Sequence, residues 1–320
     1  MRAAVVTEFG GPEVVQVQEW PEPVAGEGQA LVDVELTDVI WVETAIRRGA
    51  FGDHFDVSPP YVPGSSLGGR VLSVGAGVDE EWIGKTVLGR VDGFGAHAER
   101  VVVQADSLVE VPEELNLETA VAAIGDGFTA LLIEHAAPDL QGKEVLITAA
   151  AGGMGLLLIQ IAHQAGAHVV AAARGQAKLD LAKAQGADVV IDYTTPGWEK
   201  LVLDATLGVD VVFEGAGGKL GAAAFSTVKD GGWFSAHGAP SGGFAEYDPA
   251  EAELRGITVR GIKDVQADSQ QVSKGDVIKR VLAGELVPVI DRTFGLDQLG
   301  DAHRAIENRA LLGKSLLRIR

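Results

Sequence analysis

The sequence predicts an α/β fold with two parts, a β-rich part and a doubly wound parallel sheet. In the first 120 residues, short Val-rich segments are separated by Gly and Pro turns, which is typical of the strands of a compact β domain. From about residue 123 onward, strand-like and helix-like segments alternate, and this predicts a parallel sheet with right-handed crossovers. A chain of 320 residues is long enough for two such domains.

The β-rich part has six strand-like segments separated by turn-like loops. The segments are rich in Val and Ala, and the loops are rich in Gly, Pro and acidic residues. We expect strands over 3–6, 14–18, 29–36, 69–74, 86–89 and 98–103, with turns over 22–28 and 79–84.

The alternating part begins with two expected helices, and Asn116 is a suitable N-cap for the first of them. The expected helices span 118–123, 129–137, 153–165, 176–185, 198–206 and 219–228. The expected strands span 144–148, 168–172, 189–191, 209–214, 232–236 and 259–263. After them we expect a helix over 271–283, a strand over 288–294, a helix over 296–307 and a terminal strand over 314–319.

Charge and composition exclude several classes of partner. The chain has 26 Lys and Arg against 45 Asp and Glu, a formal net charge of −19, so its field repels nucleic acid and anionic membranes. No apolar run approaches the roughly 20 residues that span a bilayer. The first residues alternate like a strand and do not resemble a secretory signal. We therefore expect a cytoplasmic protein that binds a small-molecule substrate.

A metal site is not expected. The chain has no Cys, which removes disulfides, thiol redox chemistry and every thiolate zinc site. Its seven His are scattered, and none forms an i,i+4 pair of the kind that binds zinc on a helix.

A glycine-rich turn between a strand and a helix carries the main chemical signal. The run Val145-Leu-Ile-Thr-Ala-Ala-Ala-Gly-Gly-Met-Gly155 leads directly into an apolar helical segment. Gly152 lets the backbone approach a pyrophosphate, and Gly155 lets the helix pack closely on the sheet. Ala150 stands where the usual fingerprint has its first Gly. The alternative is a tight strand–helix turn without a ligand, but the strand–turn–helix context favours dinucleotide binding.

The residues after the next strand favour NADPH over NADH. NAD-binding sites carry Asp or Glu at the end of that strand to bind the ribose 2′-hydroxyl. This strand instead ends Val170-Ala-Ala-Ala-Arg174, and Lys178 follows one helical turn later. A guanidinium and an ammonium suit a 2′-phosphate, although each could also be a surface charge of a helix.

Several stretches together resemble one family over nearly the whole chain. The sequence is similar to the zinc-free quinone oxidoreductase (zeta-crystallin-like) branch of the medium-chain dehydrogenase/reductase superfamily. The matching residues, in order, are Met1-Arg-Ala-Ala-Val-Val, Gly10-Gly-Pro-Glu-Val14, Pro63-Gly-Ser-Ser-Leu-Gly-Gly69, Val74-Gly75, Ala149-Ala-Ala-Gly-Gly-Met-Gly155, Gln160, Gly186-Ala-Asp188, Ile191-Asp-Tyr193, Asp210-Val-Val-Phe and Gly313-Lys314.

The resemblance implies a fold, a cofactor and a reaction class. It implies a Rossmann doubly wound sheet over 123–263 inserted into a GroES-like β-rich catalytic domain made of 1–122 and 264–320. It implies NADPH as cofactor, no zinc, and reduction of quinones or of activated C=C bonds in enones and enoyl thioesters. We also expect a homodimer. The alternatives are a catalytically weak NADPH-binding protein and a zinc alcohol dehydrogenase, and the lack of Cys disfavours the second.

The resemblance also assigns cofactor contacts by position. Arg174, Lys178 and Tyr193 would surround the adenosine 2′-phosphate, and the glycine-rich turn would meet the pyrophosphate. The full set that it implies is Thr129, Gly152, Gly153, Met154, Gly155, Arg174, Lys178, Tyr193, Ala216, Gly238, Ala239, Ser241 and Lys263.

The expected catalytic side departs from the family pattern. Ile40 and Ala45 replace an Asn and a Tyr near the substrate, and Ser66 stands where an acid is common. The possible polar replacements are Asp126, His97 and His237, because hydride acceptors often need a proton donor. Of these, Asp126 and His237 are the expected catalytic groups. Ile40, Trp41 and His97 are the expected substrate contacts.

Each of these candidates has a second interpretation. Asp126 could be the N-cap of a helix starting at Thr129. His237 could instead hydrogen-bond the cofactor carboxamide. His97 could be structural, and Trp41 could belong to the core.

Overall fold

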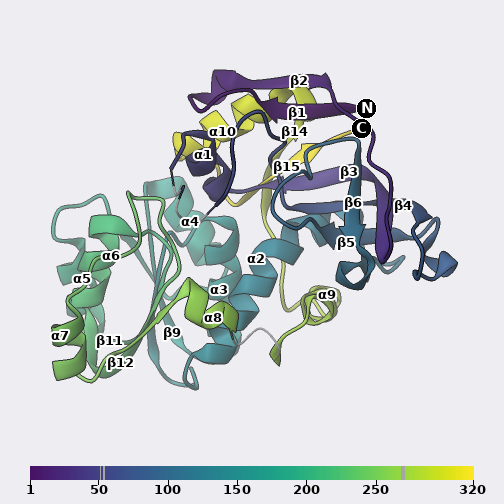
Figure 1. Cartoon of the computed structure of the whole chain (residues 1–320). Helices are drawn as coiled ribbons and strands as arrows, with labels where there is room; N and C mark the ends of the chain where they lie inside the picture. The colour runs from purple at the N-terminus through teal and green to yellow at the C-terminus, as the bar shows by residue number, and fades with distance from the viewer. Residues whose placement is uncertain (51, 53–54, 268–270) are drawn as a thin grey trace. The chain divides into compact units, whose positions relative to one another are not determined.

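The computed structural model describes residues 1–50, 52, 55–267 and 271–320, which form two compact units. Residues 1–125 and 290–320 make the first, which we call the β-rich unit, and residues 126–289 make the second, the Rossmann unit. Figure 1 shows both chain ends in the β-rich unit, in purple to blue and in yellow. We expected residues 264–289 in the β-rich unit, and they group with the Rossmann unit.

The β-rich unit is built on a sheet in which β3 (Gln29–Val39) pairs with three other strands. It is antiparallel to β15 (Lys314–Arg318), to β4 (Ser66–Val74) and to β6 (Arg100–Gln104). The sheet order is β14-β15-β3-β4-β5-β7, and β1 and β2 form a separate hairpin. The remaining elements of this unit are β1 (Arg2–Val6), β2 (Val15–Glu19), β5 (Thr86–Arg90), β7 (Val109–Glu110), β14 (Ile290–Gly295), α1 (Trp41–Arg47) and α10 (Leu299–Glu307).

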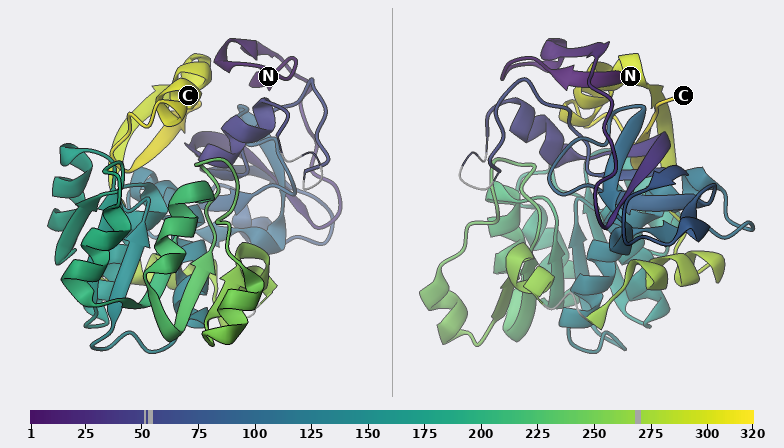
Figure 2. Two further views of the ribbon diagram at one scale, coloured as in Figure 1. Left: turned by 90° about the vertical axis from the view of Figure 1, so that its left-hand side faces the viewer. Right: turned by 45° about the vertical axis from the view of Figure 1, so that its right-hand side comes forward.

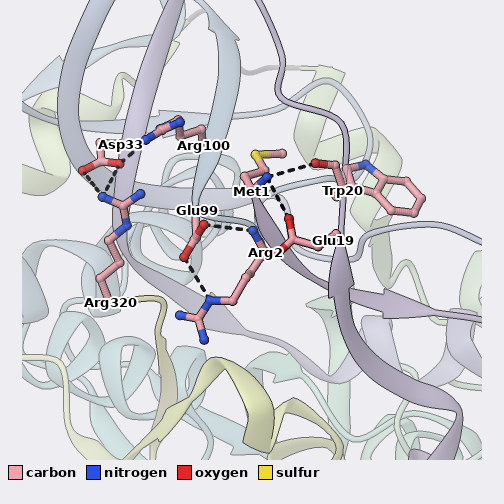
Figure 3. A network of polar contacts seen from close by, with 8 residues as sticks. All are labelled: Met1, Arg2, Glu19, Trp20, Asp33, Glu99, Arg100 and Arg320. Atoms are coloured by element: carbon pink, nitrogen blue, oxygen red, sulfur yellow. Dashed lines mark hydrogen bonds and ion pairs between the residues drawn. The ribbon is translucent and has the colours of Figure 1, made fainter.

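Apolar side chains from both chain ends share one core in this unit. Ala4, Val32 and Leu317 are each fully buried in the same cluster. Exposed ion pairs also hold the ends in place: Arg320 Nη1 lies 2.9 Å from Asp33 Oδ1, within the polar network of Figure 3. Surface pairs of this kind contribute little, about 0–1 kcal/mol each, so the shared core holds the returning segment.

The Rossmann unit contains a six-stranded, wholly parallel sheet in the order β10-β9-β8-β11-β12-β13. Helices flank its strands, as Figure 2 shows. The order runs outward from β8 to β10 on one side and from β11 to β13 on the other, so the direction of winding reverses between β8 and β11. The strands are β8 (Glu144–Thr148), β9 (His168–Ala173), β10 (Val189–Asp192), β11 (Val209–Glu214), β12 (Val228–Ala236) and β13 (Thr258–Gly261).

The helices that follow β8, β9, β10 and β11, and the helix before β14, are as the sequence predicts, most of them with shifted ends. Two short helices, Pro249–Leu254 and Ile262–Ala267, were not expected. The helices of this unit are α3 (Gly153–Gln164), α4 (Gln176–Ala184), α5 (Trp198–Thr206), α6 (Gly218–Ser226), α7 (Pro249–Leu254), α8 (Ile262–Ala267) and α9 (Lys274–Leu282). Helix α9 begins later than the expected residue 271, because Ser273 and Asp276 form a capping box there. In the described part of the chain, no helix is long and apolar enough to cross a membrane.

One long helix replaces the two that we expected over 118–123 and 129–137. Helix α2 (Leu117–Ala136) runs 20 residues without interruption. Its start is as predicted, since Asn116 Oδ1 accepts the Thr119 N–H at 2.8 Å. Gly125 and Gly127 do not break it; a Cβ at Gly127 would lie 2.7 Å from Val277, so this glycine permits close packing instead. The interpretation of Asp126 as an N-cap is therefore wrong, because Asp126 lies inside the helix.

Candidate cofactor site

The carboxyl ends of β8 and β11 flank the point where the winding of the sheet reverses. In open parallel sheets, ligands bind outside the carboxyl ends of the strands at this switch point. The loops after β8 and β11 therefore form the candidate dinucleotide site.

The turn after β8 presents backbone N–H groups. Ala149 has a positive φ of 50°, and its carbonyl accepts the Gly152 N–H at 3.0 Å. A Cβ at Gly155 would lie 2.6 Å from that carbonyl oxygen, so only glycine fits. Within α3, Leu156 donates to the Gly152 carbonyl at 3.0 Å, and helix geometry leaves the N–H groups before it without an intrahelical acceptor. Gly153, Met154 and Gly155 are thus suited to hold a pyrophosphate.

A buried carboxylate, which the sequence reasoning missed, connects the two strand ends. Glu214 is fully buried at the end of β11. Its Oε1 accepts hydrogen bonds from Thr148 Oγ1 at 3.0 Å, Ala216 N at 2.8 Å and Gly217 N at 2.7 Å. Burial raises the pKa of this carboxyl above its ordinary value, although these bonds oppose the rise. The only sequence signal was an acid directly after the Asp210-Val-Val-Phe strand.

His237 follows β12 at the same edge of the sheet. Its Nδ1 lies 2.9 Å from Ser235 Oγ, and its backbone N–H donates to the Glu214 carbonyl at 3.1 Å. Burial lowers the pKa of His237 to about 3, so its imidazole is neutral at neutral pH. A neutral imidazole can donate or accept a hydrogen bond but is a poor proton donor.

The loops after β11 and β12 touch each other. A Cβ at Gly238 would lie 2.0 Å from the Gly215 carbonyl oxygen, so glycine is required at this close approach. Ser241 N donates to the Ala216 carbonyl at 2.9 Å. The structure thus brings Ala216, Gly238, Ala239 and Ser241 together beside His237.

The three residues expected at the 2′-phosphate lie where β9 and β10 end side by side. Arg174 follows β9 and is exposed, and Lys178 lies in the first turn of α4. Tyr193 follows β10 and packs edge-on against Trp198, with ring centroids 6.3 Å apart. Asp192, which we did not single out, ends β10, and its Oδ2 accepts the Gly175 N–H at 3.0 Å.

Three further candidates of the Rossmann unit lie on helices. Asp126 and Thr129 occupy α2, one turn apart, and both are partly buried. The strand expected over 259–263 ends at Gly261, so Lys263 stands in the first turn of α8 instead.

The candidates of the β-rich unit occupy two different environments. Ile40 and Trp41 stand where β3 ends and α1 begins, and both are partly buried. His97 is fully buried: its Nδ1 lies 2.8 Å from Thr37 Oγ1 and its Nε2 2.9 Å from Glu43 Oε2. The expected substrate contact His97 thus occupies an interior position, because the buried Glu43 carboxylate requires polar partners.

Glu43 is the centre of a buried polar cluster in this unit. Besides His97, its Oε2 lies 3.5 Å from His303 Nε2, and His303 Nδ1 accepts from Arg47 Nε at 3.1 Å. Arg47 also pairs with Glu307. Burial opposes ionisation of Glu43, but the two histidines outweigh it and lower the pKa to about 2.

The described residues of the chain offer no zinc site. Cys is absent from the sequence. Among the residues that the structure describes, no group of three or more His, Asp or Glu side chains is placed to hold a metal ion.

Comparison with protein families finds matches in both units. Residues 26–113 match the alcohol dehydrogenase GroES-like domain, and residues 153–274 match the zinc-binding dehydrogenase family. The second match concerns the dinucleotide-binding fold, since this chain lacks Cys ligands for zinc.

Two relatives extend over nearly the whole chain. A probable quinone oxidoreductase of Schizosaccharomyces pombe is 31% identical and covers 98% of this chain and 95% of its own. A 2-haloacrylate reductase of a Burkholderia species is 28% identical and covers 98% of each chain.

Two solved structures, each 28% identical and covering 100% of both chains, have the same fold. A mycobacterial protein in complex with NADPH gives a TM-score of 0.89, and an NAD-dependent alcohol dehydrogenase gives 0.87. The fold, the two domain matches and the 31% identical relative agree. The chain therefore belongs to the quinone oxidoreductase branch of the medium-chain dehydrogenase/reductase superfamily.

Proposed function

We propose that this protein is an NADPH-dependent reductase of quinones or of activated C=C bonds. The observation that supports it most is the set of backbone donors at the switch point of the sheet, where Gly153, Met154 and Gly155 begin α3. The similarity to a quinone oxidoreductase and to a 2-haloacrylate reductase supports the two acceptor classes.

Each part of the site has a role in this proposal. The first turn of α3 binds the pyrophosphate, and Arg174 and Lys178 bind the 2′-phosphate as cations. Ala216 and Gly238 line the nicotinamide end, and His237, being neutral, orients it by hydrogen bonding. When bound, NADPH supplies a hydride to the acceptor.

The acceptor side is proposed from the family resemblance. Ile40 and Trp41 are the proposed acceptor contacts, and Asp126 is the preferred proton donor. His237 is the weaker candidate for that role, because burial lowers its pKa to about 3. General acid assistance is worth about 100- to 10,000-fold.

The test is a titration followed by turnover. NADPH should bind the purified protein. The oxidation of NADPH should then depend on an acceptor, tested with a panel that contains a quinone, an enone and a 2-haloacrylate. Asp126→Ala should lower kcat on the enone while leaving the NADPH dissociation constant nearly unchanged. Full turnover by that variant would remove Asp126 from the mechanism and leave His237 or water as the proton source.

The panel also tests the main alternative. Tight NADPH binding with no turnover on any acceptor would identify a cofactor-binding protein that is not a reductase of these classes. Failure to bind either dinucleotide would reject the proposal altogether.

A further inference from the structure

We propose that Asp192 is a specificity-determining residue, whose carboxylate weakens binding of the 2′-phosphate and so narrows the preference for NADPH over NADH. This inference rests on the proposed function, because it concerns the adenosine end of the same cofactor site. It modifies the expectation from the sequence, which considered only the acid-free end of β9.

The fold places Asp192 beside the residues expected at the 2′-phosphate. Strand β10 runs parallel to β9, and Asp192 lies opposite Ala173, the residue before Arg174. In this fold, the ribose 2′-oxygen lies at the end of the second strand, which is β9 here. A carboxylate one strand away, at the same edge, can replace the acid that β9 lacks.

Hydrogen bonds fix the orientation of the Asp192 carboxylate. Its Oδ2 accepts the Gly175 N–H at 3.0 Å, and its Oδ1 accepts the Thr194 N–H at 2.8 Å and the Thr194 hydroxyl at 2.6 Å. Gly175 directly follows Arg174, so the carboxylate is tied to the backbone that carries the guanidinium. These hydrogen bonds oppose a rotation of the carboxylate away from a bound anion.

The Asp192 carboxylate is ionised at neutral pH. The hydrogen bonds from Thr194 and Gly175, together with the positive charge of Arg174, lower its pKa below the ordinary value. An ionised Asp192 therefore offsets part of the positive charge that Arg174 offers to a phosphate. NADH, which has a hydroxyl at that position, is not repelled and can donate to a carboxylate.

The experiment is a titration of Asp192→Asn and the parent protein with NADPH and NADH by calorimetry. Losing the charge should tighten NADPH binding by about fivefold to tenfold, as expected for one charge near a phosphate dianion in a solvated site. NADH binding should stay the same or weaken. Thermal unfolding checks that the variant is folded, and Asp192→Ser, which also removes the charge, is the second variant should the amide disturb the Gly175 turn.

Asp188→Asn is a matched control from the other end of β10. The Asp188 carboxylate also accepts a backbone N–H of a neighbouring strand, from Val169 at 2.8 Å, but at the amino edge of the sheet. Asp188→Asn changes the net charge by the same amount as Asp192→Asn, but far from the proposed 2′-phosphate position. It should therefore leave the ratio of the NADH to NADPH dissociation constants within about twofold of the parent value.

The outcomes separate this inference from the function on which it rests. The role of Asp192 would be overturned if the ratio of the NADH to NADPH dissociation constants were unchanged in both Asp192 variants, or if Asp188→Asn shifted it equally. In either case, NADPH binding by the parent protein would still support the proposed function. A parent protein that binds neither dinucleotide would reject both.

Discussion

Thr148 and Glu214 connect the carboxyl ends of β8 and β11 through one hydroxyl–carboxylate contact of 3.0 Å. The same hydroxyl accepts the Gly215 N–H at 2.9 Å and the Ala216 N–H at 3.2 Å. One threonine side chain at the end of β8 thus holds the start of the loop after β11. Thr148 lies within the glycine-rich run, but its role could not be predicted from that run, because the groups that it contacts belong to another strand.

Thr148→Val should therefore weaken NADPH binding by about tenfold and lower the free energy of unfolding by about 1–2 kcal/mol, because the Gly215 N–H loses its acceptor and the buried Glu214 carboxylate loses a donor. Titration calorimetry and denaturant unfolding measure the two effects. Thr227→Val is the control: its buried hydroxyl donates to the Ala224 carbonyl at 2.7 Å, next to the start of β12. Thr227→Val should lower the free energy of unfolding by a similar amount and leave the NADPH affinity unchanged. A loss of NADPH affinity in both variants would show that Thr148 has no special role.

Glu43 makes the β-rich unit sensitive to acid. Its pKa is about 2 in the folded protein and 4.5 as a free side chain, so folding favours the ionised carboxylate. This stability is fully present above pH 4.5 and is lost as the pH falls from 4.5 to about 2. The loss should amount to about 3 kcal/mol, measured by urea unfolding across this range. Glu43→Gln should be less stable at neutral pH and should lose much of this acid dependence; an unchanged dependence would exclude Glu43 as its source.

At the scale of elements, helix α2 shows what local sequence reasoning misses. Gly125 and Gly127 are poor helix formers, and their sequence predicts a break. The helix continues because both glycines face close neighbours: a Cβ at Gly125 would lie 3.3 Å from Asp38 Oδ2. Tertiary packing, which is invisible in a local window, overrides the propensity.

Gly127→Ala should consequently destabilise the Rossmann unit by about 1–3 kcal/mol, since its Cβ would meet Val277 Cγ1 on α9 at 2.7 Å. Gly275→Ala, on α9 itself, is the control, because its Cβ would meet only Ser273 Oγ at 3.5 Å. That substitution should be neutral or stabilise the protein by up to about 1 kcal/mol. Thermal unfolding of the two variants tests the difference, and equal effects would contradict the packing argument.

The sequence predicted the strand–helix alternation because each element there depends on nearby residues. The segment 198–206, for example, is the helix expected, and 209–214 the strand expected. The positions of His97 and Asp192 could not be predicted in this way. His97 is buried and contacts Thr37 and Glu43, and the partly buried Asp192 contacts Gly175. Such pairs exist only after the chain has folded.

At the scale of the whole molecule, the β-rich unit depends on residues from the far end of the chain. Strand β15 lies between β14 and β3, so both neighbours lose hydrogen bonds when it is removed. A protein truncated after Gly313 should therefore have an unfolded or aggregating β-rich unit. Limited proteolysis followed by mass mapping would locate the damage, with cleavage expected inside 1–125 before 126–289. A truncated protein as stable as the full chain would contradict the topology.

The same arrangement of the chain has a consequence for synthesis on the ribosome. Residues 126–289 are contiguous, so this unit can fold as soon as it has emerged. The first 125 residues appear earlier but must wait for β14 and β15, which are translated after residues 126–289. For most of translation the nascent chain therefore carries an N-terminal sheet whose strand β3 has an unpaired edge. We therefore expect the first 125 residues to be the part of the nascent chain most exposed to aggregation until β15 pairs with β3.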